Sequence, residues 1–398
     1  MNDNHFDVIV VGAGAAGSMA AYDLARAGAR VLVIEKERLP RYKPCGGGLT
    51  EKVIGLLPFS IASVVEDTIH RVRFTFKLGD PVELCHPTPL LYMVMRDRFD
   101  QFLVEQAREA GTQVREGITV KGISPNGKSE VITGDGDFTA DVVIGADGAN
   151  GPVARSLGLM ADVSHMVAWE TEVEPEPAAL ARCSGTAGLD LGTLPASYAW
   201  TFPKQGRLSI GVGGQERVAK SLKSYYGDFL ARQNLGSYRI LTQKGHRLPL
   251  RRSGSPIHRG RAALIGDAAG LVDAFTGEGI YWALASGRLA ARAALEVLGG
   301  RAATMAGYEQ MVDIELMPEL IYSRRWLNIY LWWPRLCYRL LRDSSRFWDA
   351  TARILRGEKT YASIERTLGP FSFVAHLLPD GVKGETGGRK GREGSHNR

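Results

Sequence analysis

The sequence is poor in cysteine and lacks long apolar runs. Its four cysteines, Cys45, Cys85, Cys183 and Cys337, form no CxxC pair and no cysteine–histidine cluster with metal-ligand spacing. Neither a disulfide framework nor a bound metal is therefore expected, and a reducing compartment fits. No run of about 18 apolar residues occurs, so no membrane-spanning helix is predicted. The N-terminus also lacks the basic and apolar regions of a signal peptide, which favours a cytoplasmic location.

The chain has little excess charge of either sign. Its 398 residues include 49 Lys and Arg against 43 Asp and Glu, a net charge of +6. This excess suits an ordinary solvated surface, and it is also compatible with a phosphorylated substrate or an anionic membrane. No nucleic-acid partner is expected. A hydrophobic content of 44% is typical of globular proteins, and the length allows two domains or one composite domain.

What the sequence does contain is a strand–turn–helix–strand pattern at residues 7–36. An apolar run leads into Gly12, Gly14 and Gly17, and a second apolar run ends at Glu35. Such glycines allow a tight turn, close approach of the backbone to a pyrophosphate, and packing of helix against strand. The helix N-terminus favours phosphate, and the terminal acid accepts hydrogen bonds from a ribose diol. The segment predicts a dinucleotide site.

Two further glycine-rich segments occur at residues 44–50 and 266–279. The first holds three consecutive glycines after Cys45, a loop able to approach a flat ligand. In the second, Asp267 follows an apolar strand and offers a carboxylate to a ribitol hydroxyl. The helix after Gly279 can direct its N-terminus at the flavin edge that becomes anionic on reduction. Together the three segments predict one FAD site.

The pattern of the whole chain predicts an α/β fold, an α+β composite. A Rossmann-like FAD-binding domain is interleaved with an antiparallel-sheet substrate domain, and a helical C-terminal region follows. The predicted FAD-binding domain is discontinuous and comprises residues 1–60, 90–158 and 256–300. The predicted substrate domain comprises residues 61–89 and 159–255, the helical region 301–378 and a disordered tail 379–398.

Several local features are specific enough to check. Thr50 is predicted to cap a helix reaching Leu57, and residues 70–95 are predicted to form strands of the second sheet. Pro125–Gly127 is predicted to be a turn between two strands. Residues 197–203 alternate, so Tyr198, Trp200 and Phe202 are predicted to face one side, with residues 208–213 as the hairpin partner.

The C-terminal region is basic and rich in aromatic residues. Between positions 321 and 370 there are ten Lys and Arg against four Asp and Glu, with Trp326, Trp332, Trp333 and Trp348. Tryptophan favours membrane interfaces, and arginine favours anionic headgroups. Two interpretations remain open, a peripheral contact with the inner face of a membrane and a helical cap packed on the core.

Five sequence motifs carry a family resemblance. They are KPCGGGLT (43–50), YAWTFPK (198–204), GDAAGLVDAFTGEGIYWAL (266–284), WPRLCYRLL (333–341) and RGEKTY (356–361). Over roughly residues 5–375 the chain resembles the geranylgeranyl reductase family of flavoproteins, within the superfamily similar to p-hydroxybenzoate hydroxylase. Glycine turns occur across many flavoproteins, whereas PCGGG together with YxWxFP is much narrower.

The resemblance implies where FAD and a substrate lie. Positions implied around the ADP moiety are Gly12, Gly14, Ala16, Gly17, Glu35, Arg96 and Val120, with Lys36 as a further cofactor-binding position. Positions implied around the flavin are Cys45, Gly46, Gly48, Asp267, Gly279 and Ile280. Tyr198, Trp200 and Phe202 are implied to line an apolar tunnel for a polyprenyl chain.

The implied reaction is reduction of isolated C=C bonds in a geranylgeranyl or polyprenyl chain. The hydride comes from the reduced flavin, and Cys45 is the candidate for proton delivery because it is the one titratable group in the glycine loop; the alternative is that Cys45 only packs. No second dinucleotide motif is visible, so NADPH, ferredoxin or a quinol remain open as electron donors. The other functions considered are an aromatic monooxygenase, suggested by Gly145–Gly148, a flavin halogenase and a non-catalytic carrier.

Overall fold

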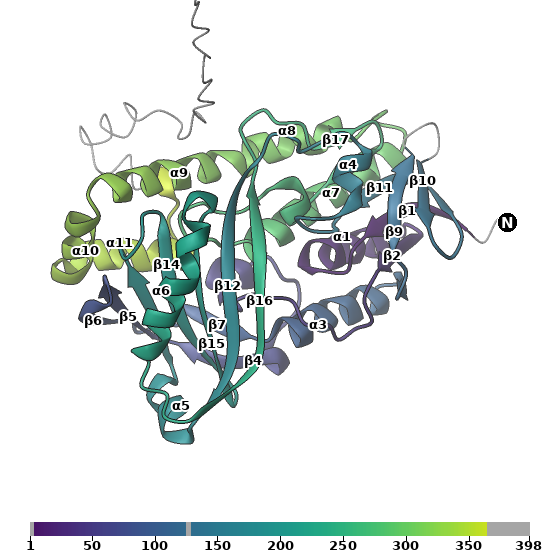
Figure 1. Cartoon of the computed structure of the whole chain (residues 1–398). Helices are drawn as coiled ribbons and strands as arrows, with labels where there is room; N and C mark the ends of the chain where they lie inside the picture. The colour runs from purple at the N-terminus through teal and green to yellow at the C-terminus, as the bar shows by residue number, and fades with distance from the viewer. Residues whose placement is uncertain (1–3, 125–128, 364–398) are drawn as a thin grey trace, which may run out of the picture.

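The computed structural model describes residues 4–124 and 129–363 (Figure 1). The predicted turn at Pro125–Gly127 and the predicted C-terminal tail therefore lie outside the described residues. Within them the predicted α/β composite fold is confirmed: one mostly parallel sheet, one large mostly antiparallel sheet, and helices after both. All four cysteines are free, as the sequence predicts.

The first sheet contains the nucleotide-binding pattern. Its strand order is β17-β18-β11-β1-β2-β8, with β10 pairing β11 and β9 pairing β10. Strand β1 is parallel to both β2 and β11, which places the first glycine turn at the carboxyl edge of the sheet. The strands are β1 (His5–Val11), β2 (Val31–Glu35), β8 (Gln113–Glu116), β9 (Val120–Ser124), β10 (Ser129–Thr133), β11 (Phe138–Gly145), β17 (His258–Arg259) and β18 (Ala262–Leu264).

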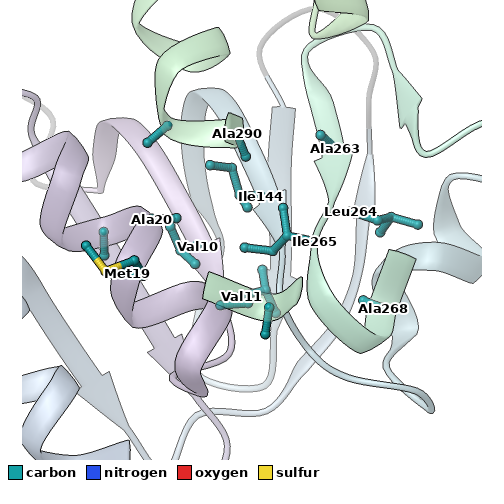
Figure 2. Close-up of a cluster of buried hydrophobic side chains, with 14 of the residues drawn as sticks. Val10, Val11, Met19, Ala20, Ile144, Ala263, Leu264, Ile265, Ala268 and Ala290 are labelled. Atoms are coloured by element: carbon teal, nitrogen blue, oxygen red, sulfur yellow. The ribbon is translucent and has the colours of Figure 1, made fainter. Parts of the chain in front are cut away.

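Helices α1 (Ala15–Arg26) and α7 (Ile280–Leu298) pack on this sheet and on each other. Figure 2 shows the buried cluster between them, in which Val10 and Ile144 of the strands meet Met19 and Ala290 of the helices. The contact is close because both helices present small residues. A Cβ at Gly287 would lie 2.5 Å from the carbonyl oxygen of Ala16. Helix α3 (Arg96–Glu109) packs beside α1.

The second sheet has the order β16-β12-β15-β14-β13-β5-β6. All neighbours are antiparallel except β5 and β13, which are parallel, so the predicted antiparallel sheet needs that one correction. The predicted β14–β15 hairpin is confirmed. The strands are β5 (Arg71–Phe76), β6 (Gly79–Cys85), β12 (Ser164–Pro175), β13 (Thr186–Leu191), β14 (Ser197–Lys204), β15 (Arg207–Gln215) and β16 (Tyr238–Leu250).

Two helices not expected from the alternating pattern, α5 (Pro177–Cys183) and α6 (Ala219–Ala231), interrupt the chain between these strands. Tyr225 and Phe229 of α6 are buried against Leu208 and Ile210 of β15. The strands therefore alternate because one face of the sheet packs against α6, and the opposite face carries Trp200 and its neighbours.

The prediction that residues 70–95 all belong to the second sheet is wrong for β7 (Leu91–Val94). It pairs with β3 (Gly48–Thr50) and β4 (Val65–Ile69) in a separate three-stranded sheet. Thr50 precedes a helix as predicted, but α2 (Glu51–Ile54) is shorter than predicted. The Thr50 hydroxyl donates to the carboxylate of Glu278, which lies just before α7, at 3.0 Å and makes no capping hydrogen bond to α2.

Helices α8 (Ala306–Glu315), α9 (Met317–Trp332), α10 (Pro334–Asp343) and α11 (Ser345–Leu355) form the C-terminal region, and a short α4 (Pro152–Ser156) follows β11. In Figure 1, α10 and α11 lie beside β5 and β6, far from the N-terminus. Tyr338 stacks on Phe76 at 5.1 Å, and the Trp348 indole donates to the Cys85 carbonyl at 3.0 Å. The helices thus cap the second sheet. No described helix is long and apolar enough to cross a membrane.

Candidate functional site

The backbone at Ala146 packs directly against the first glycine turn. Gly12 has φ +105°, and a Cβ there would lie 2.5 Å from the Ala146 carbonyl oxygen, so no other residue fits. Gly14 is the N-cap of α1 and receives no side-chain cap. The first N–H groups of α1 therefore remain available to an anion.

A guanidinium lies beside that helix N-terminus. Arg41 Nη2 lies 3.6 Å from the position of a Cβ at Gly14, and its Nη1 donates to Asp100 at 2.9 Å. The predicted Glu35 is buried at the end of β2 and accepts from the Ala13 N–H at 2.8 Å. Arg41 Nε is 3.6 Å from Glu35, so one arginine spans both acids. Arg41 could not be identified from the sequence, since a single basic residue in a loop carries no specific pattern.

A third acid faces the same turn. Asp147 Oδ2 accepts a hydrogen bond at 2.9 Å from the N–H of Val153, which is in the first turn of α4. The other oxygen of Asp147, Oδ1, is buried with no partner among the described residues. Burial raises the pKa of Asp147 to about 6. The exposed Lys36 contributes a charge that opposes this rise. An orphaned acceptor next to Gly12 fits a ligand that brings a hydroxyl or N–H donor.

Asp267 sits in a 3-10 turn, η3 (Gly266–Ala269), where β18 ends. Its Oδ2 is 3.2 Å from Lys43 Nζ and 3.3 Å from His246 Nε2. Burial opposes ionisation, but Lys43 and His246 together hold the pKa of Asp267 far below its usual range, so it is a charged acceptor. Its Oδ1 lies 3.4 Å from a Cβ position at Gly279, the N-cap of α7.

The glycine loop after Cys45 packs directly on the aromatic residues of β14. A Cβ at Gly46 would lie 2.8 Å from the Phe202 ring and 3.3 Å from Trp200 Nε1. The three aromatic rings follow one another, with centroids 5.8 Å apart for Tyr198–Trp200 and 6.4 Å for Trp200–Phe202. The Tyr198 hydroxyl donates to the Thr276 carbonyl at 2.7 Å. The predicted one-sided aromatic face is confirmed, and it meets the glycine loop.

Cys45 lies next to a buried cation. Arg96 forms two hydrogen bonds with Asp100, at 2.8 and 2.9 Å. Burial disfavours its charge, but Asp100 and then the Cys45 thiol raise the pKa of Arg96 above its ordinary value. Arg96 is therefore permanently charged and adjacent to Cys45. Its expected contact with an ADP moiety stays a prediction.

The remaining predicted positions are distributed around these elements. Ala16 of α1 lies 3.1 Å from a Cβ position at Gly266, and Ile280 begins α7. Gly48 begins β3, where a Cβ would face Leu91 and Met93, and Val120 is buried in β9. Their roles beside a cofactor stay predictions.

The donors and acceptors fit FAD. Two uncapped helix N-termini and Arg41 suit the pyrophosphate and the flavin edge, and Glu35, Asp147 and Asp267 suit hydroxyl groups. Gly12 and Gly46 let these loops pack against Ala146 and Phe202, where a Cβ would overlap the protein's own atoms. Sequence reasoning missed Arg41, Lys43 and His246. Lys43 is the first residue of the KPCGGGLT motif, and this was the one sequence signal that could have identified any of the three.

Comparison with known proteins supports FAD as the cofactor. The family model described as FAD binding domain matches residues 5–187. The geranylgeranyl diphosphate reductase of Rhodobacter capsulatus is 33% identical over 304 residues, covering 74% of this chain and 76% of the relative. The residues that match therefore extend from the nucleotide-binding sheet into the second sheet.

Solved structures share the fold. A geranylgeranyl bacteriochlorophyll reductase-like protein from Thermoplasma acidophilum superposes with a TM-score of 0.73 and 25% identity, covering 80% of this chain and 86% of that one. The flavin-dependent brominase Bmp2 gives a TM-score of 0.72 at 19% identity, over 93% of this chain and 100% of that one. The second likeness concerns the fold alone.

Proposed function

The chain belongs to the geranylgeranyl reductase family of FAD-dependent flavoproteins, and we propose that it saturates C=C bonds of geranylgeranyl or other polyprenyl chains. The substrate molecule that contains these double bonds is a prenyl lipid, a prenyl diphosphate, a pigment or a quinone with a prenyl tail. The observation that carries the proposal is the contact between the glycine loop and the Trp200–Phe202 face.

An aromatic wall next to the flavin-binding loop suits an isoprenoid. Isoprene units have no polar groups for a protein to bind, so affinity must come from burying apolar surface, worth about 25 cal/mol per Å². Tyr198 and Trp200 have their polar atoms satisfied by Thr276 and Ser209, at 2.7 and 3.3 Å, so neither residue presents an unpaired polar atom to a ligand. An aromatic acid or phenol would instead need polar partners on this wall.

Reduced FAD supplies a hydride when bound. The remaining requirement is a proton, because an isolated alkene has no carbonyl to accept charge. We assign proton delivery to Cys45, whose S–H bond breaks as a new C–H bond forms. The thiolate left behind is adjacent to the buried Arg96 cation. One hydride and one proton per double bond balance the reaction.

The electron donor and the location belong to the same proposal. NADPH is our first expectation as reductant, with ferredoxin or a quinol as alternatives. We propose a cytoplasmic protein with a peripheral membrane contact through Trp332, Trp333, Leu336 and Leu340, which are exposed at the end of α9, between the two helices and on α10. Arg335 and Arg339 lie on the same helix, α10, and suit anionic headgroups.

The decisive test is anaerobic. The purified protein is reduced with dithionite and mixed with geranylgeranyl diphosphate, and the visible flavin band is followed together with product mass. Reoxidation without oxygen, with product gaining one hydrogen molecule's mass per bond, supports the proposal. A flavin that stays reduced until oxygen is admitted would instead favour the aromatic monooxygenase.

A further inference from the structure

A cavity of about 440 Å³ lies beside β12, β16 and the first turns of α6. Its lining includes Asn150 after β11, Trp169 of β12, Leu222 and Lys223 of α6, and His246 and Arg247 of β16. Sites for small molecules are typically about 300–1,000 Å³, so this cavity is large enough to hold a ligand or a substantial part of one. Apart from His246, none of these residues has a role in the site described above.

The charged side chains that line the cavity are basic, and its lining contains no Asp or Glu. Lys223 is exposed and forms no ion pair with the described residues. Arg247 Nη2 lies 3.1 Å from Glu216 Oε1, but both side chains are 52% exposed. Because an exposed ion pair contributes little, Arg247 can exchange Glu216 for a phosphate, to which a guanidinium donates two hydrogen bonds. The charges therefore favour an anionic ligand.

Trp169 brings an aromatic ring to the cavity that β16 leaves uncovered. In the register of the second sheet Trp169 is opposite Gly245, so no side chain of β16 covers the indole. A Cβ at Gly245 would lie 3.5 Å from the ring, so any larger residue there would begin in contact with it. An accessible aromatic ring is a stacking surface for a nucleobase, whatever the identity of the base.

His246 connects the cavity with the turn predicted to bind the flavin. It lines the cavity, and its Nε2 lies 3.3 Å from Oδ2 of Asp267, the carboxylate predicted to meet the ribitol of FAD. Asn150 belongs to the same loop as Asp147, whose orphaned oxygen also fits FAD. A ligand in the cavity is therefore close to the predicted flavin position.

The composition of the lining favours one class of ligand. The proposed reaction needs a two-electron donor, and the first glycine turn is already assigned to FAD. An aromatic ring, two cations and a carboxamide suit a nucleotide that carries several phosphates. An acid usually binds the ribose diol of NADH, whereas an arginine accommodates the 2′-phosphate of NADPH. With Arg247 present and no acid in the lining, the cavity fits NADPH better than NADH.

We propose that this cavity binds NADPH as the electron donor. The adenine lies on Trp169, the phosphates contact Lys223 and Arg247, and the nicotinamide end is directed past His246 to the flavin. A nicotinamide C–H bond breaks, its hydride forms an N–H bond on the flavin, and NADP⁺ leaves. The inference rests on the proposed function, because it supplies the electrons of that reaction.

Binding is tested first without turnover, by calorimetric titration of the oxidised, FAD-loaded protein. NADP⁺ and 2′,5′-ADP should bind, and NAD⁺ should bind at least about tenfold more weakly because it lacks the 2′-phosphate. Lys223→Ala and Arg247→Ala should each weaken NADP⁺ binding about tenfold. Lys220→Ala and Arg239→Ala are the matched controls, because both side chains are exposed on the same helix and the same strand but lie outside the cavity lining.

The aromatic platform is tested with two variants that act in opposite ways. Trp169→Leu removes the ring but keeps an apolar side chain against α6, and it should weaken NADP⁺ and NAD⁺ binding alike, about fivefold or more. Gly245→Val keeps the ring and covers it, and it should weaken both to a similar extent. A Cβ at position 245 makes only an ordinary contact, so this variant should keep the wild-type melting temperature.

Flavin reduction separates the donor site from the substrate site. Without prenyl substrate, Arg247→Ala should raise the NADPH concentration for half-maximal flavin reduction about tenfold, with the limiting rate within about twofold of the wild type. After reduction with dithionite, the same variant should reduce geranylgeranyl diphosphate at the wild-type rate.

Four results would overturn the donor site. They are no NADP⁺ binding by the wild type, equal affinities in the cavity variants and their controls, displacement of NADP⁺ by geranylgeranyl diphosphate, and flavin reduction by reduced ferredoxin but not by NADPH. The third would assign the cavity to the substrate's phosphates, and the fourth would indicate a protein donor. If NADP⁺ binds as expected but the reduced protein saturates no prenyl chain, the proposed function fails while the donor site stands.

Discussion

The ammonium of Lys43 lies 3.2 Å from Oδ2 of Asp267, although 224 residues separate them in the chain. This ion pair joins the loop that precedes Cys45 to the turn in front of α7. His246 approaches the same oxygen from β16, so one carboxylate ties together the glycine loop, the first sheet's last turn and the second sheet. Asp267 therefore holds the glycine loop and the turn before α7, both predicted to bind the flavin, against the second sheet.

Replacing this carboxylate should weaken FAD binding. In Asp267→Asn the half-buried Lys43 loses its counter-charge, and a hydrogen bond to a charged group contributes about 1.5–3 kcal/mol. We expect FAD affinity to fall about tenfold or more, measured by fluorescence titration of the apoprotein. The control is Glu296→Gln, whose exposed partner is Arg301 at 2.6 Å. Equal FAD affinity in the wild type and Asp267→Asn would contradict this role.

A single methyl group at Gly46 should disturb the site. A Cβ there would overlap Phe202 at 2.8 Å, and overpacking typically costs about 1–3 kcal/mol. We expect Gly46→Ala to lower both the melting temperature and prenyl reduction. Gly227→Ala is the matched control, because nothing lies within 4 Å of its Cβ position in α6, and alanine favours a helix. Similar losses in both variants would argue against the predicted clash.

Substitutions of Cys45 test directly whether its thiol is the proton donor. Cys45→Ala should slow alkene reduction about 100-fold while FAD stays bound, since general acid catalysis contributes a factor of this order. Cys45→Ser should recover little, because a hydroxyl is a weaker acid than a thiol. Reduction rates are measured under anaerobic conditions with FAD content as the folding check. An unchanged rate would mean that Cys45 only packs.

Two tryptophans of the C-terminal helices test different roles. Trp348 tests the packing of these helices on the second sheet, and Trp332 tests the proposed membrane contact. Trp348 is buried against Phe74, so Trp348→Ala should cost about 3–5 kcal/mol of stability. Trp332 is 64% exposed, so Trp332→Ala should leave the melting temperature unchanged and reduce sedimentation with anionic vesicles. Retained vesicle binding in a Trp332→Ala, Trp333→Ala double variant would exclude these residues as the membrane contact.

The buried carboxyl of Asp147 should make the free energy of unfolding depend on pH. Its pKa rises from 3.8 to about 6 on folding because of burial, so the folded state binds more protons than the unfolded state between these values. Its contribution to the unfolding free energy is therefore largest below about pH 4 and decreases as pH rises to about 6, by up to about 3 kcal/mol. Asp147→Asn should lack this decrease in denaturant titrations of the FAD-free protein. Parallel pH curves would refute the shift.

Local patterns in the sequence were enough to predict much of the fold. The strand–glycine–helix–strand segment, the β14–β15 hairpin and helix α7 were all predicted, because residue spacing and glycine position act within a few residues. The side of β14 that carries Tyr198, Trp200 and Phe202 followed from the two-residue period. The free state of all four cysteines followed from their spacing.

Tertiary packing decided the rest. Strand β7 alternates like its neighbours, yet it pairs with β3 and β4, since strand partners depend on which edges meet. Thr50 bonds Glu278 rather than capping α2 for the same kind of reason. Single residues such as Arg41, Lys43 and His246 carry no periodic signal. Their charges acquire chemical meaning only where folding brings distant strands and loops together and excludes water.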